Sequence, residues 1–303
     1  MLISKKLRIT GQVQGVGFRP HVYNLARSMR INGYVSNDER GVIIELQADQ
    51  EAIDRFCKEL INNPPHLARI QSHVLEDTDD ERFMDFRIKA SQKSGPLNLQ
   101  LTPDFGICAT CKEEIADSEN RRFGYPFTTC VNCGPRWAVT RHFPFEREHT
   151  SLDEFPMCPD CTEEYQDPSN RRFHSQTNSC SVCGISLGLF DADGNPLKVL
   201  KSELFKEIAK EVSGGKIAAI KNTGGYLLCC DADNPEAVKR LRQRKKRPSK
   251  PFALMYPSLE ILRGELHINE AQRTTLESVP RPIVIIPFRE YKGPLALKDI
   301  APG

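Results

Sequence analysis

The sequence lacks any long apolar run, and its apolar stretches stay well short of the ~18 residues that a membrane-spanning helix requires. It also lacks a secretory signal, because it opens with the strand-like residues MLISKKLRIT and has no apolar stretch followed by a small-residue cleavage site. These absences predict a cytoplasmic protein without a membrane segment. In that compartment we expect its cysteines to stay reduced.

Neither sign of charge is in excess, since 42 basic residues face 40 acidic ones and the formal net charge is +2. A protein whose whole surface holds nucleic acid would be strongly basic, so this balance excludes that class and confines any basic site to a local patch. The length of 303 residues predicts two or three domains of about 100–200 residues each.

Cysteine, in contrast, is abundant, and eight of the 11 cysteines fall in four Cys-x-x-Cys pairs. The pairs belong to an internal repeat with a period of 50 residues: FGICATCKEEIADSENRRF from Phe105 returns as FPMCPDCTEEYQDPSNRRF from Phe155. A second pair follows each copy. The repeat predicts two small four-cysteine modules within residues 104–187.

The spacing of the pairs, Cys-x2-Cys-x18-Cys-x2-Cys in both copies, is typical of a tetrahedral zinc site. With four thiolates on the metal no position is open for a catalytic water, so we expect two structural zinc ions. Duplicated quartets argue against a redox pair. Spacing alone leaves open whether each zinc binds one copy, as we expect, or a pair from each. The predicted ligands are Cys108, Cys111, Cys130, Cys133, Cys158, Cys161, Cys180 and Cys183. His149 and His174 lie nearby and are expected to pack rather than to bind metal.

Residues 1–90 alternate strand-like and helical apolar patterns in the order β-α-β-β-α-β, with one extra edge strand. This order predicts a ferredoxin-like domain. Its first strand leads into the glycine-rich segment 11–19, GQVQGVGFR, just before a helix. Backbone amides of such a loop, the helix N-terminus and Arg19 together could hold a small dianion. A glycine loop alone is also compatible with an ordinary turn.

The segments GQVQGVGFRP and GYVSND, followed by Gly41 and Val42, resemble the acylphosphatase family. The resemblance implies that Arg19 binds the phosphate of an acyl phosphate and that Asn37 orients the attacking water. The alternative for Asn37 is a plain turn residue. The resemblance further assigns the phosphate-wrapping amides to Gln14, Gly15, Val16, Gly17 and Phe18.

A linker at residues 91–103, rich in Ser, Gln, Lys, Gly and Pro, and a turn-rich break at residues 191–196 separate the cysteine modules from the flanking parts. Residues 195–303 alternate helical and strand patterns and predict an α/β domain, with strands at residues 217–220, 252–255 and 283–286. The fold class is thus α+β with several domains. Because the last residues form a loop, we expect this third domain to be interrupted.

A run of eight basic residues without an acid, KRLRQRKKRPSK, spans residues 239–250. It is compatible with a solvated helix face or a nucleic-acid patch, although no aromatic residue interleaves it. No Gly-x4-Gly-Lys-Ser/Thr loop is present. Together with the segments GGKIAAIK and GGYLLCCDA, the run resembles the YrdC-like fold of enzymes that make carbamoyl adenylates. The resemblance implies that ATP phosphates contact Lys221, Lys245, Arg247, Ser249 and Lys250.

The order of the three parts resembles the HypF family, the carbamoyltransferases of nickel-iron hydrogenase maturation. The resemblance implies hydrolysis of carbamoyl phosphate in the first part and activation of carbamate by ATP, with Mg, in the third. It also implies transfer of the carbamoyl group to the C-terminal cysteine of the partner HypE, which makes the cyanide ligands of the hydrogenase iron. We expect the chain to lack the transferase domain.

Two alternatives remain at this point. A threonylcarbamoyl-adenylate synthase for tRNA modification leaves the first motif and the zinc pairs unexplained. The second alternative is an RNA-binding protein in which the zinc ribbons and the basic run contact the RNA.

Overall fold

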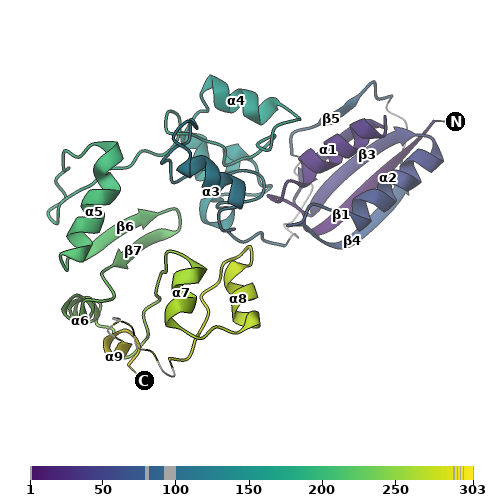
Figure 1. Cartoon of the computed structure of the whole chain (residues 1–303). Coiled ribbons are helices and arrows are strands. Elements are labelled where there is room, and N and C mark those ends of the chain that lie inside the picture. The colour runs from purple at the N-terminus through teal and green to yellow at the C-terminus, as the bar shows by residue number, and fades with distance from the viewer. Residues whose placement is uncertain are drawn as a thin grey trace. The chain divides into compact units, whose positions relative to one another are not determined.

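The computed structural model describes residues 2–78, 82–91, 100–288, 291, 293, 295 and 297–302. The chain divides into two compact units, Met1–Ile185 and Ser186–Gly303 (Figure 1). Residues 92–99, most of the predicted linker, lie outside the described residues.

The first unit begins with a five-stranded sheet in the order β4-β1-β3-β2-β5. All neighbouring strands are antiparallel except β2 and β5, which run parallel. Two helices lie along this sheet (Figure 1). The predicted ferredoxin-like order and its extra edge strand are confirmed. The elements are β1 (Ile3–Gln12), α1 (Phe18–Ser28), β2 (Asn32–Asp38), β3 (Gly41–Ala48), α2 (Gln50–Asn62), β4 (Arg69–Asp77) and β5 (Phe86–Ile88).

The core of this sheet follows from two apolar periodicities. In β1, Leu7 and Ile9 alternate with more exposed residues and are fully buried, as expected of a strand with one face on the core. In α2, Ile53, Phe56 and Leu60 recur at helical spacing and are buried against the same core. The predicted phosphate loop, residues 13–17, leads from the end of β1 into α1.

The rest of the first unit contains the cysteine modules, which have little regular structure. Each module has one eight-residue helix, α3 (Ala109–Ala116) in the first and α4 (Pro159–Gln166) in the second. Three short 3-10 turns lie between the modules: η1 (Trp137–Val139), η2 (Arg147–His149) and η3 (Ser151–Glu154). The modules therefore depend on side-chain interactions for their shape.

The second unit contains a two-stranded antiparallel sheet, β6 (Ala218–Asn222) with β7 (Gly225–Cys229), and several helices. These helices are η4 (Lys201–Glu203), α5 (Leu204–Ser213), α6 (Pro235–Arg244), α7 (Leu259–Glu265), α8 (Glu270–Glu277) and α9 (Leu297–Ile300). No helix in the described residues has the length and hydrophobicity to cross a membrane.

Two predicted strands of this unit are wrong. Residues 252–255 and 283–286 form no strand, and Ile283 and Ile285 are 82% and 89% exposed. The run at residues 217–220 does enter β6, but Ile220 is 42% exposed rather than buried. An apolar run becomes a strand only when another strand completes its hydrogen bonds, and the pattern of one segment does not supply that partner.

Candidate active site and metal centres

The predicted phosphate loop joins β1 to the start of α1. Gly15 and Gly17 have φ angles of +71° and +74°, a left-handed conformation that glycine adopts without steric cost. Within the described residues, no protein acceptor is found for the backbone amides of Gly15, Val16, Gly17 and Phe18. Amides left free at a helix N-terminus form a ready binding site for an anion.

The side chain of Gln14 holds this loop in place. Its Nε2 donates to the carbonyl oxygens of Asp38 and Gly41, at 2.7 and 2.8 Å, in the turn between β2 and β3. Its Oε1 accepts from the amide of Phe145 at 3.0 Å. Gln14 thus ties the loop both to the sheet and to a segment 131 residues further along the chain.

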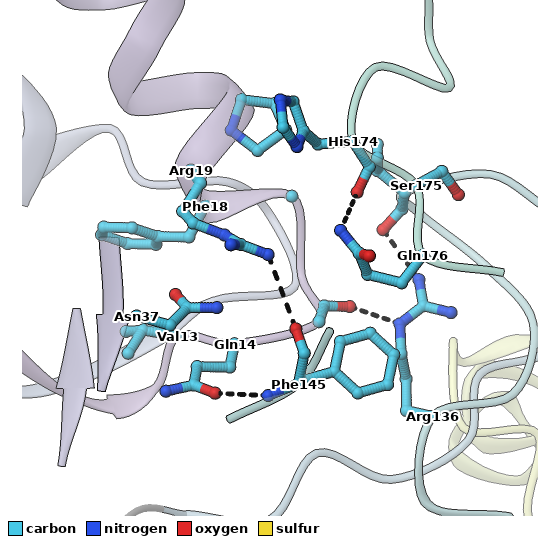
Figure 2. A pocket seen from close by; sticks show the side chains of 14 residues that line it. Val13, Gln14, Phe18, Arg19, Asn37, Arg136, Phe145, His174, Ser175 and Gln176 are labelled. Carbon is cyan, nitrogen blue, oxygen red and sulfur yellow. Dashed lines mark hydrogen bonds between the residues drawn. The ribbon is translucent and has the colours of Figure 1, made fainter. Parts of the chain in front are cut away.

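Arg19 and Asn37 lie beside the loop, as the sequence predicts, and Figure 2 shows their side chains close together. Asn37 is 1% exposed, and its Oδ1 has no hydrogen-bond partner among the described residues. A buried amide oxygen without a partner is unfavourable unless a ligand or a water completes it. This atom can therefore accept a hydrogen bond from a water molecule in the cavity.

A cavity of about 30 Å³ lies between these residues and the cysteine modules. Residues far along the chain, in and between the modules, also line it: Val131, Arg136, Phe145, His174, Ser175 and Gln176. Figure 2 shows those that it labels, Arg136, Phe145, His174, Ser175 and Gln176, opposite Arg19 and Asn37. The sequence alone does not predict that these residues line the cavity. Nothing in these residue types signals a ligand site, and only the packing of the modules on the phosphate loop reveals it.

Arg136 connects the first cysteine module to the phosphate loop. It is fully buried, and its Nε donates to the Gly15 carbonyl. Its two Nη atoms donate to carbonyls of residues 130–135. Burial lowers the pKa of Arg136 to about 10, against the opposing effect of nearby cysteines, so the guanidinium keeps its charge at neutral pH.

His174 has a strongly altered pKa. Burial, together with the positive charge of Arg19, lowers it to about 4, and the carboxylate of Glu146 opposes this only in part. The ring packs against Tyr165 and Phe173. His174 is therefore a neutral group at physiological pH. His174 packs as predicted, and in addition it borders the cavity.

The eight predicted ligand cysteines form two clusters, and each cluster belongs to one copy of the repeat. The four sulfur atoms of each cluster lie within 4.8 Å of one another, and neighbouring sulfurs are typically 3.8 Å apart. Sulfurs bound tetrahedrally to zinc at ~2.3 Å are separated by about 3.8 Å. The clusters therefore fit two four-cysteine zinc sites with pairing inside each copy.

Each module places two consecutive arginines against the other module, and their bonds hold the two modules together. Arg121 of the first module donates from Nη2 to sulfurs of the second cluster at 3.4 Å. Arg171 of the second donates to the sulfurs of Cys108 and Cys111 at 3.3 and 3.0 Å. Because four thiolates on Zn²⁺ leave a net negative charge, a guanidinium from the opposite module stabilises each cluster.

The arginine that directly follows each of these two in the sequence, Arg122 or Arg172, binds a glutamate of the opposite module. Arg122 holds the carboxylate of Glu164 with both Nη atoms, and Arg172 holds that of Glu114 in the same way. Burial alone would raise the pKa of Glu164, but the hydrogen bonds and charge of Arg122 lower it to about 2. Glu164 thus stays ionised.

The predicted nucleotide residues all lie in the second unit, in two places. Lys221 is exposed on β6, where it contacts the Tyr226 ring of the same hairpin. Arg247 folds back on its own turn, donating to the carbonyls of Lys250 and Pro251 at 3.1 and 2.6 Å. Lys245, Ser249 and Lys250 are exposed in that turn after α6. No hydrogen bond or ring contact joins Lys221 to that turn within the described residues.

Comparison with known families assigns a profile to each of the three parts. A profile described as acylphosphatase matches residues 5–88, and one described as the HypF finger matches residues 107–140 and 157–190. A profile described as telomere recombination, named for Sua5, YciO and YrdC, matches residues 210–302. An acylphosphatase from Thermotoga petrophila is 40% identical over 85 residues, which cover 28% of this chain and 93% of that protein.

Longer relatives match across nearly the whole chain. The carbamoyltransferase HypF of Synechocystis sp. is 41% identical over 303 residues, covering 100% of this chain and 39% of the relative. That of Rhizobium leguminosarum bv. viciae is 45% identical, with 96% and 36% covered. A crystal structure of full-length HypF in a phosphate- and nucleotide-bound form superposes with a TM-score of 0.82 at 37% identity, covering 92% of this chain and 36% of that one. The chain spans 36–39% of the length of these relatives.

Weakening one of the reciprocal arginines should destabilise both modules. We expect Arg172→Lys to lower the free energy of unfolding by about 3 kcal/mol, because a lysine cannot hold the largely buried Glu114 with two parallel bonds. Arg141→Lys is the control, since Arg141 and Glu154 are 48% and 63% exposed and such pairs contribute about 0–1 kcal/mol. Urea unfolding in the presence of zinc measures both. If the two substitutions lowered the free energy of unfolding equally, the stabilising role of the arginines between the modules would be contradicted.

His174 should titrate with a midpoint near pH 4 in a nuclear magnetic resonance titration of its ring proton. Because this pKa lies below the ordinary 6.5, the stability gained by keeping the ring neutral is complete above pH 6.5 and is lost as the pH falls toward 4. Arg19→Ala should raise the midpoint by removing a positive charge. Arg55→Ala, an exposed change on α2, should leave it in place, and a parent midpoint above 6 would refute the assignment.

Proposed function

We propose that this chain, which belongs to the family of HypF carbamoyltransferases, hydrolyses an acyl phosphate, carbamoyl phosphate, in the cavity beside its phosphate loop. The observation that carries the proposal is that Arg19, the loop amides and the Oδ1 of Asn37 converge on one cavity. Within the described part of the chain, neither these amides nor this oxygen has a hydrogen-bond partner. A full-length HypF whose crystal structure contains phosphate superposes on this chain, which supports an anion site in the family.

The chemistry requires charge stabilisation and a positioned water rather than a covalent side chain. Arg19 and the amides of residues 15–18 bind the phosphoryl oxygens and stabilise the charge that spreads over them. Asn37 Oδ1 accepts a hydrogen bond from water and holds it for attack on phosphorus. The bond from phosphorus to the acyl oxygen then breaks, and the products are phosphate and carbamate.

The second unit supplies part of the proposed activation site. There, carbamate attacks the α-phosphorus of ATP, with Mg, and displaces pyrophosphate to give carbamoyl adenylate. The cysteine thiol at the C-terminus of HypE then takes the carbamoyl group, and AMP leaves. We propose these steps for the full-length form of the family, with ATP phosphates contacted by Lys221, Lys245, Arg247, Ser249 and Lys250. The nucleotide in the full-length HypF structure supports this. We further propose a role in hydrogenase maturation and a cytoplasmic location.

The basic run offers less support for RNA binding. Arg240 and Arg242 of α6 donate to the carbonyls of Gly215, Asp299 and Ile300. Arg242 also lies over the ring of Phe252, at 4.5 Å from its centroid. Guanidinium groups that hold the unit together are poorly placed to bind phosphates of a nucleic acid. A threonylcarbamoyl-adenylate synthase accounts for the second unit alone.

The four-cysteine clusters are proposed to hold two structural zinc ions, whose charge neutralises thiolates that would otherwise repel one another. Zinc supplies no chemistry to the hydrolysis, because four sulfurs leave it no open position. Bound zinc would fix the turn of residues 130–135. Arg136 bonds to carbonyls of this turn and to the Gly15 carbonyl, so the turn also holds the phosphate loop.

Substitutions in the phosphate site should separate binding from catalysis. Arg19→Ala is expected to raise KM and lower kcat for carbamoyl phosphate, because it removes a charge needed in both the bound and the transition state. Asn37→Ala should lower kcat about 100-fold or more with little change in KM, since water positioning matters only as the reaction proceeds. Arg27→Ala, an exposed change on α1, is the control. Parent-like hydrolysis by both site variants would place the reaction elsewhere.

The purified chain should contain about two equivalents of zinc. Chelation should increase hydrogen exchange across residues 104–187, because metal binding and local folding are linked. Cys111→Ser should lose one equivalent and also loosen the second module, whose sulfurs are bonded to Arg121 of the first. Cys57→Ser, outside both clusters, should retain two. Less than one equivalent after refolding with zinc would overturn the assignment.

A further inference from the structure

Arg19, the proposed phosphate ligand, already holds an anion. The carboxylate of Glu146 contacts both Nη atoms of the guanidinium, Oε2 lying 3.0 Å from Nη2. The two side chains are only 8% and 13% exposed. Glu146 precedes η2 in the segment that joins the two cysteine modules, and the hydroxyl of Ser91 also donates to it.

This carboxylate occupies the two Nη atoms of Arg19 that a phosphate would also need. A guanidinium binds carboxylate and phosphate alike through two parallel N–H bonds, so the two anions compete for Arg19. The cavity beside it, at about 30 Å³, holds little more than water. Because both anions need the same Nη atoms, an acyl phosphate can bind the Arg19 guanidinium only after the Glu146 carboxylate moves.

The charges favour an exchange of one anion for another. Two guanidinium groups border the cavity in the described part of the chain, those of Arg19 and Arg136. Arg136 is bonded throughout to backbone carbonyls, which cannot leave. The partner of Arg19 is a side chain that can rotate away. When Glu146 leaves, a phosphate dianion balances both positive charges, whereas phosphate and Glu146 together would leave excess negative charge in a buried site.

The backbone around Glu146 can remain in place while its side chain turns. The amide of Phe145 donates to Gln14 Oε1 at 3.0 Å, and that of Arg147 donates to Gln176 Oε1 at 2.8 Å. These two bonds hold the segment on either side. Among the described residues, the contacts that need to break are those of the Glu146 carboxylate with Arg19 and Ser91.

We infer that Glu146 is an internal competitor for the phosphoryl group: it binds Arg19 in the empty site, phosphate expels it, and it returns when phosphate leaves. It thereby sets the affinity of the site and favours dianions, because a weakly bound monoanion such as a carboxylate does not displace it. The inference rests on the proposed function for its substrate, although the competition itself concerns phosphate binding alone.

Calorimetric titration of the 303-residue chain with inorganic phosphate tests this inference. Glu146→Gln removes the competing charge and keeps the size of the side chain, so it should bind phosphate at least about tenfold more tightly than the parent. Glu148→Gln, two residues further on and 75% exposed, is the matched control and should bind as the parent does. Unchanged or weaker phosphate binding by Glu146→Gln would overturn the inference.

If Glu146→Gln does not fold, Glu146→Asp decides. Its carboxylate is one methylene shorter and holds Arg19 less well, so this variant must also bind phosphate more tightly than the parent, and equal or weaker binding rejects the competition. Turnover is not needed for either measurement. A chain that shows the expected phosphate affinities but hydrolyses no acyl phosphate would refute the proposed function and leave the role of Glu146 intact.

Discussion

The reciprocal bonding between the two cysteine modules is the interaction on which the rest of the first unit depends. Each module is short, with one eight-residue helix. Among the described residues, the buried cluster of the first module consists of Cys111, Cys130 and Cys133, with Ile107 packed against it. Arg121 and Arg171 each donate to sulfurs of the opposite cluster, and the arginines that follow them bind a glutamate there. The two modules are therefore joined by bonds between charged side chains and cysteine sulfurs.

The joined modules complete a site which the ferredoxin-like sheet only begins. The sheet presents the loop, Arg19 and Asn37, whereas the modules provide Arg136, which bonds the loop carbonyl of Gly15. The consequence is a small, largely buried cavity in which a guanidinium acts with little screening by water. In such a place a single carboxylate, Glu146, has a large effect on what can bind.

The second unit shows where apolar patterns stop being informative. β6 and β7 form as a hairpin, and α5 and α6 form where helical spacing indicates helices, because these elements satisfy their backbone groups locally or with the adjacent segment. Residues 283–286 have an equally apolar pattern, yet Ile285 is 89% exposed. A strand requires a partner edge, and the pattern of the strand itself says nothing about whether one is near.

The sequence by itself determined the ferredoxin-like order, the loop with Arg19 and Asn37, and the two cysteine quartets, because each is a local or periodic signal. Tertiary structure alone decided which cysteines cluster, since spacing allowed exchange between copies. It also placed Arg136 and His174 at the proposed phosphate site and Glu146 on Arg19. Glu146 lies 127 residues from Arg19 in the chain, and its neighbours in sequence carry no mark of a ligand. The physical reason is that an ion pair in a buried site depends on distance and desolvation, which only the folded chain establishes.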